Sequence, residues 1–170
     1  DPARRPLVAS GVVSAFQKVF AESWGPRLQY VLTNSVLALL ETPGTTLVSL
    51  VRLLHDRTYR RSLVLRLADP TVRAFWESEF EPLPPRLKAE WIAPVQNKVG
   101  ALVTNPLLRA VVGQPRSTLD LRRVMDEEQV LLINLSKGRL GDDASTLLGS
   151  LLVTAIQLAA MSRAELPEQL

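Results

Sequence analysis

The residues best placed to bind a charged ligand are arginines that crowd into one stretch of the sequence. They are Arg52, Arg57, Arg60, Arg61 and Arg66. Helical spacing would put Arg57, Arg60 and Arg61 on one face, with Tyr59 among them. Such a face suits contact with DNA phosphates or with an acidic partner, and it is equally typical of a solvated basic surface.

A second candidate is a short polar loop that contains Ser136, Lys137 and Arg139 and ends at Gly141. At the carboxyl end of a strand, these side chains would face a nucleotide or DNA, because ligands of α/β proteins gather there. The order of glycine, lysine and serine is not that of a Walker A loop, in which stacked amides and a lysine hold phosphates. An ordinary strand-to-helix connection with solvated charges explains the same residues, and we favour it.

Two groups of carboxylates also need an interpretation. Glu77, Glu79 and Glu81 flank aromatic residues of the kind usually found in a core. Their spacing gives little support for acid–base catalysis, and a solvated helix face is the simpler explanation. Asp142 and Asp143 precede a long apolar stretch, where aspartate caps a helix more often than it binds metal. We therefore predict no catalytic residue and no metal site.

Composition excludes several classes of site. The 170 residues include no cysteine, so disulfides, thiolate zinc sites and cysteine nucleophiles are ruled out, and His55 is the single histidine. A hydrophobic fraction of 46% is enough for a folded core, and the net charge of +3 is only mildly basic. Trp24, Trp76 and Trp91 could stack bases, but core packing suits their positions better.

Residues 1–115 read as an all-helical domain. Apolar residues recur at helical spacing, and proline, glycine and aspartate mark the breaks between helices. The predicted helices cover residues 7–22, 26–41, 46–55, 57–67, 71–80, 86–103 and a short segment from 106, with a further turn at 119–125.

Residues 116–170 change character. The run from Gln129 to Leu135 is almost continuously apolar, which is typical of a strand buried on both faces of a parallel sheet. A helix without charges follows from Ala144, and we expect it to be a buried core helix rather than a membrane span. Strand, short loop and long helix form half of a βαβ unit. No other stretch reads as a strand, so the partner strands should lie outside this chain or come from a second copy.

The run from Arg122 to Gly141 (RRVMDEEQVLLINLSKGRLG), continued by Gln157 to Arg163 (QLAAMSR), resembles a known family. It is similar to DNA-translocating P-loop ATPases of the HerA/FtsK class, and most of all to coupling proteins of conjugation and type IV secretion of the TraG/TraD kind. The resemblance implies a mainly α chain that lies between Walker A and Walker B. Residues 1–115 would be the helical domain inserted in the motor, and 116–170 a strand–helix fragment of its RecA-like core.

The same resemblance implies a role for the parent protein. The parent would be a cytoplasmic ATPase at the inner face of a membrane, a homo-hexamer that uses ATP and Mg²⁺ to move DNA or a nucleoprotein. This chain would bind no cofactor itself and would be inactive alone. The residues themselves leave open an alternative, a stand-alone helical interaction module that dimerises through residues 129–135.

Overall fold

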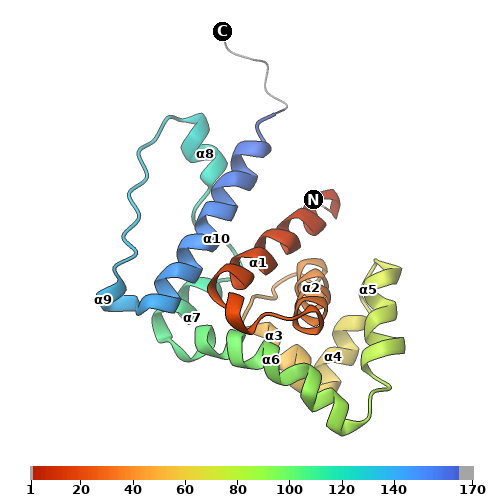
Figure 1. Ribbon diagram of the computed structural model, residues 1–170. Helices are drawn as coiled ribbons and strands as arrows, with labels where there is room; N and C mark the ends of the chain where they lie inside the picture. The colour runs from red at the N-terminus through yellow and green to blue at the C-terminus, as the bar shows by residue number, and fades with distance from the viewer. Residues whose placement is uncertain (1, 165–170) are drawn as a thin grey trace.

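The computed structural model describes residues 2–164, and these residues fold mainly into helices (Figure 1). The predicted mainly α class is confirmed. In chain order the elements are η1 (Pro2–Arg4), α1 (Arg5–Val19), η2 (Ala21–Ser23), α2 (Pro26–Glu41), α3 (Ser49–His55), α4 (Arg57–Val64), α5 (Pro70–Ala74), η3 (Phe75–Phe80), α6 (Pro85–Thr104), α7 (Pro106–Val112), α8 (Leu121–Asp126), α9 (Lys137–Leu140) and α10 (Asp142–Met161).

Several helices begin where a short polar side chain caps them. The Asp56 carboxylate accepts the Tyr59 amide at 2.9 Å at the start of α4. Asp69 accepts the Thr71 amide at 2.8 Å before α5, and Asn105 accepts the Leu107 amide at 3.0 Å before α7. These bonds satisfy amides that have no partner inside the helix, so local sequence alone sets these boundaries.

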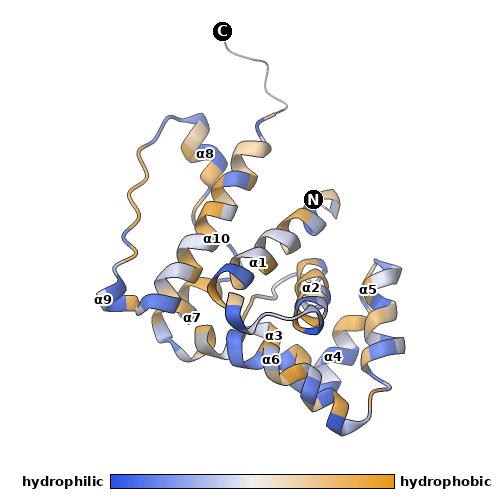
Figure 2. Ribbon diagram, viewed as in Figure 1, coloured by the Kyte–Doolittle hydropathy of each residue, from blue (hydrophilic) through white to orange (hydrophobic). Residues whose placement is uncertain are grey.

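The core lies where α2 packs between α1 and α6, with α3 and α5 beside it. Apolar residues of α2 such as Val31 and Leu32 are fully buried, as is Phe16 of α1. Hydrophobic and hydrophilic residues alternate along these helices (Figure 2), and the buried residues among them are mostly apolar. Burial of an apolar side chain of this size contributes about 1.5–3 kcal/mol, which explains why the helical body holds together.

A cluster of aromatic side chains from η3 forms another part of the core. The η3 segment is π-helical, and the Glu81 amide donates to the Trp76 carbonyl at 2.9 Å, five residues back. The wider turn brings the Trp76 and Phe80 rings into edge contact, with centroids 5.0 Å apart. Trp76 is therefore a core residue rather than a base-stacking platform, as predicted from its position.

The C-terminal third departs from prediction. Residues 129–135 are extended but belong to no strand among residues 2–164, so the expected strand buried on both faces is not found. A strand needs neighbours to fill its backbone hydrogen bonds, and the described residues offer none. The expected loop after it contains one helical turn, α9. The predicted domain boundary at residue 115 stays a prediction.

α10 is also less buried than the sequence predicts. It packs against α1 and α8, but of its own residues only Ser145 and Leu147 are buried. Among the described helices it is the one long and apolar enough to cross a membrane, judged by length and composition alone. The rest of its apolar surface is thus only partly covered.

The contact between α1 and α10 depends on a glycine. A Cβ atom placed on Gly11 would lie 2.3 Å from Cγ2 of Thr154, which is well inside van der Waals contact. The two helices can approach this closely only because residue 11 has no side chain. This contact fixes where α10 sits on the helical body.

Gly11→Ala should therefore destabilise the chain by about 1–3 kcal/mol, because the added methyl group forces α1 and α10 apart. Gly100→Ala in α6 is the matched control, since its Cβ would meet nothing within 4 Å. Alanine there should be neutral or stabilising by about 0.5–1 kcal/mol. Urea unfolding measures both. Equal effects of the two variants, or no recovery on adding Thr154→Ser to Gly11→Ala, would show that α10 does not pack there.

Candidate interaction surfaces

Residues 129–135, hereafter the extended segment, run from α8 to α9 along one side of α10 (Figure 1). Their exposure alternates. Val130 and Leu132 are 87% and 90% exposed, whereas Leu131 and Ile133 are 36% and 41% exposed. A two-residue period is that of a β-strand, so the segment already has one face turned toward the protein and one toward solvent. Both faces are apolar.

The backbone of the extended segment is unpaired between its ends. At the start, the Gln129 amide donates to the Val124 carbonyl at 2.9 Å. At the end, the Ser145 hydroxyl donates to the Leu135 carbonyl at 2.6 Å. Within the described residues, amides and carbonyls 130–134 have no hydrogen-bond partner. The segment is thus held extended at both ends, while its backbone edges stay available for pairing.

The side chain of Leu135 anchors the segment to α10. Its Cδ1 would lie 3.1 Å from a Cβ placed on Gly149, so the absence of a side chain at Gly149 lets the segment and the helix come close. The extended segment therefore contacts α10 at its end nearest α9.

The predicted loop residues lie just after the extended segment. The Ser136 amide donates to the Asn134 side chain at 3.0 Å, and Lys137 pairs with Asp142 at 2.5 Å. The side chains of both Lys137 and Asp142 are well exposed. Arg139 is exposed and has no ion-pair partner within residues 2–164. The three predicted residues therefore gather at one end of the segment, with Lys137 already neutralised.

The arginines of the other predicted site do not share one surface. Arg60 is only 4% exposed, so the expectation that it lies on the same solvent-facing side as Arg57 and Arg61 is wrong. Its guanidinium donates to the Leu53 and Leu54 carbonyls, both at 3.1 Å, and these bonds hold the C-terminus of α3. Arg60 turns inward because those carbonyls, left unpaired by the end of the helix, need a donor.

The remaining arginines are exposed and differ in their partners. Arg52 pairs with Asp56 at 3.2 Å and stacks over the Tyr59 ring, with its guanidinium carbon 4.4 Å from the centroid. Arg61 and Arg66 have no ion-pair partner within the described chain. Arg57 bonds to the carboxylate of Glu81, the residue that follows η3. The surface that α4 offers thus contains Arg57 and Arg61, one helical turn apart.

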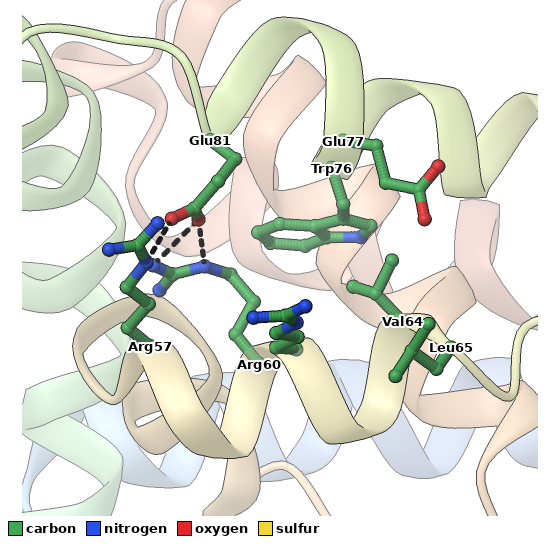
Figure 3. A pocket seen from close by; sticks show the side chains of 8 residues that line it. Arg57, Arg60, Val64, Leu65, Trp76, Glu77 and Glu81 are labelled. Atoms are coloured by element: carbon green, nitrogen blue, oxygen red, sulfur yellow. Dashed lines mark hydrogen bonds and ion pairs between the residues drawn. The ribbon is translucent and has the colours of Figure 1, made fainter.

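Glu81 is the carboxylate that joins these elements (Figure 3). It accepts from Arg57 Nε at 2.7 Å and from Arg60 Nη2 at 3.0 Å, and Lys88 Nζ lies 3.9 Å away. Partial burial opposes ionisation of Glu81, but the ion pairs, of which Arg60 is the strongest, lower its pKa. Burial also lowers the pKa of Lys88. Glu81 is therefore a structural ion-pair centre rather than the solvated carboxylate predicted from spacing.

A cleft of about 410 Å³ lies beside this ion-pair centre, between α4 and η3 (Figure 3). We call it the α4 cleft. Its lining includes Arg57, Arg61 and Leu65 from α4 and the turn after it, and Trp76, Glu77 and Glu81 from the facing chain. This cleft was not predicted from the sequence, because it forms where α4 meets a segment that comes later in the chain.

The structure also shows where the other acidic residues considered in the sequence lie. Glu79 accepts the Tyr30 hydroxyl at 3.0 Å, and Glu77 is exposed at the mouth of the α4 cleft. Asp142 and Asp143 occupy the first turn of α10, where their negative charge suits the helix dipole, but the predicted cap is not found: α10 begins at Asp142 rather than Ala144, its N-cap is Gly141, and no side chain caps it. Among residues 2–164, no group of three or more histidine, aspartate or glutamate side chains could hold a metal ion.

Comparison with protein-family models, with curated proteins and with solved structures finds no match for this chain.

Proposed function

We propose that the chain is the helical, partner-facing part of a DNA-translocating ATPase, and that the extended segment is a strand of that motor's parallel sheet. One observation carries the proposal. Residues 130–133 are extended and apolar on both faces, and the backbone of residues 130–134 has no partner within the described residues. These backbone groups are exposed to water in this chain, but in the interior of a parent protein each one left unpaired would cost about 1–3 kcal/mol, so burial of the segment requires flanking strands.

The side of the segment that faces α10 supports a parallel sheet in particular. Leu131, Ile133 and Leu135 are the less exposed residues, and Leu135 meets α10 at Gly149. In a parallel sheet, helices cover both faces, so Val130 and Leu132 would be covered by a helix from another part of the parent protein. Burial of these two side chains alone would contribute about 1.5–3 kcal/mol each.

The motifs present in the sequence indicate which tasks of the motor this chain would perform and which the rest of the parent protein would perform. The chain has no Walker A or Walker B sequence, so the parent's remaining parts would bind ATP and Mg²⁺ and perform hydrolysis. Ser136, Lys137 and Arg139 would stand at the carboxyl end of the strand, where α/β sites collect. The helical body would face the DNA, nucleoprotein or protein partner. The resemblance to conjugative coupling proteins implies a cytoplasmic homo-hexamer at the inner face of a membrane.

The flanking gene sequence and ATP turnover test this proposal together. We expect GxxxxGK[ST] upstream and an apolar strand that ends in Asp-Glu downstream. The full-length product should hydrolyse ATP with Mg²⁺, and purified chain 1–170 should not. Turnover by chain 1–170 that disappears in Lys137→Ala would refute the proposal, as would flanks without a phosphate-binding loop.

The same observation also favours a second possible source of a neighbouring strand, namely another copy of this chain. In that case the chain would be a dimeric interaction module paired through the extended segment. Sedimentation velocity distinguishes the two: a dimer that dissociates in Ile133→Pro supports the module, because proline removes an amide from the ladder. A monomer at all concentrations supports the motor assignment.

A further inference from the structure

The α4 cleft has a charge balance that favours an anion. Glu81 is already shared by Arg57, Arg60 and Lys88, so the cations around it outnumber it. Arg61 is exposed and lacks an ion-pair partner in the described residues. Glu77 is the other carboxylate of the lining, and it lies on the side of the indole away from Glu81 (Figure 3). The end of the cleft near Arg57 and Arg61 is therefore positively charged.

The same cleft also has an apolar wall. Leu65 is 67% exposed, and the buried Val64 and Trp76 side chains form the floor beside it. A second hollow of about 460 Å³ continues along α4 and shares Arg57, Arg61 and Leu65 with the first. The two hollows form one groove in which guanidinium groups stand next to an exposed leucine. A ligand that fills it must carry negative charge and apolar groups close together.

An unsatisfied donor on the cleft wall is a separate sign of a missing partner. Trp76 is 1% exposed, and its indole Nε1 has no hydrogen-bond acceptor in the structure. The indole nitrogen is on the side of the ring where Val64 and Glu77 lie, away from the Glu81 ion pairs (Figure 3). A buried N–H without an acceptor costs about 1–3 kcal/mol. A ligand oxygen that enters between Val64 and Glu77 would recover part of this cost.

We infer that the α4 cleft binds a peptide segment that combines acidic and aliphatic side chains. A carboxylate would lie between Arg57 and Arg61, and an aliphatic side chain would pack on the exposed Leu65, beside the indole N–H of Trp76. DNA fits less well. Phosphate-driven binding depends on many neutralised phosphates, whereas this groove offers two exposed guanidiniums, one of them shared with Glu81. The buried Trp76 ring cannot stack on a base. The inference stands apart from the role of the extended segment.

The test is a titration of ¹⁵N-labelled chain 1–170, followed through its indole N–H resonances. The probe is a blocked octapeptide of alternating glutamate and leucine, and its counterpart has glutamine in place of every glutamate. The glutamate peptide should shift the Trp76 resonance, which Trp76→Phe identifies, and should bind at least about tenfold more tightly than the glutamine peptide. Arg61→Glu should weaken binding at least about tenfold. Arg66→Glu, a charge reversal outside both hollows, should leave it within about twofold.

Three results would overturn the inference. One is an unmoved Trp76 resonance with either peptide. Another is equal binding of the two peptides, because charge recognition would then be absent. The third is tighter binding of a twenty-residue oligothymidine than of the glutamate peptide, which would assign the groove to nucleic acid. Arg61 lies outside every ion pair described above, so Arg61→Glu should keep the fold, and circular dichroism verifies this.

Discussion

Replacing Glu81 with leucine should destabilise the folded chain by about 3 kcal/mol, because Arg60 would stay buried without its carboxylate. Arg60 is 4% exposed and keeps only the Leu53 and Leu54 carbonyls as acceptors once Glu81 is lost. Those carbonyls satisfy its hydrogen bonds in part but do not neutralise its charge. Urea unfolding of both proteins at pH 7 measures the difference.

Two matched variants test whether the lost stability comes from the buried charge of Arg60 or from the loss of any ion pair with Glu81. Arg57→Met removes an ion pair with Glu81 that is shorter than that of Arg60, 2.7 Å against 3.0 Å, but the Arg57 side chain is 80% exposed, so the loss should stay below about 1 kcal/mol. Adding Arg60→Met to Glu81→Leu should recover most of the lost stability, because no buried charge then remains. If Glu81→Leu and Arg57→Met proved equally mild, Arg60 would not depend on Glu81.

The difference in stability between the wild type and Glu81→Leu should also decrease as the pH falls. The ion pairs lower the pKa of Glu81 in the folded chain below its unfolded value of about 4.3. Its contribution to stability is therefore complete above that unfolded value and is lost as the pH falls through the lower folded pKa. The difference between the wild type and Glu81→Leu should shrink in acid and be constant from about pH 6 to 8.

Leu132→Asp should have little effect on the isolated chain but a large effect on the proposed motor. Leu132 is 90% exposed in chain 1–170, so the substitution should change its free energy of unfolding by less than about 0.5 kcal/mol. In the full-length product, the aspartate would have to be buried in the sheet, at a cost of several kcal/mol. ATP turnover of that product should fall by at least about a hundredfold, which corresponds to about 2.8 kcal/mol.

The control for this variant is Leu107→Asp, because Leu107 is also more than half exposed but lies on the short helix α7. It should leave ATP turnover of the full-length product within about twofold. Leu132→Val should be tolerated in both settings, since valine suits a strand. Normal turnover in Leu132→Asp would mean that Leu132 stays exposed in the motor and that the extended segment is not an inner strand.

The helical body could be predicted closely because its signals are local. Asp56, Asp69 and Asn105 each cap a helix through an amide two or three residues away, and Pro26 opens α2 in its first turn. Such contacts depend on neighbouring residues in the sequence and on nothing else. The burial of Trp76 followed from its position on a helical face that suits core packing.

The candidate sites depended on contacts that the sequence does not encode locally. Arg60 was expected on the surface with Arg57, because the spacing of residues on a helix says nothing about which side meets α3. Glu81 was expected to be solvated, because its pairing with Arg60 requires η3 to fold back onto α4. The extended segment was predicted to be a strand from its composition, and that prediction is wrong for the described residues, because a strand forms only when its neighbours are present.

Hydrogen exchange of amides 130–134 is the most direct measurement of the central claim, that the extended segment is a strand whose partners come from the rest of a motor. In chain 1–170 these amides should exchange at close to unstructured rates, since they have no partner among the described residues. In the full-length product they should be protected by at least about a thousandfold. Rapid exchange in the full-length product, or concentration-dependent protection in chain 1–170 alone, would contradict the account.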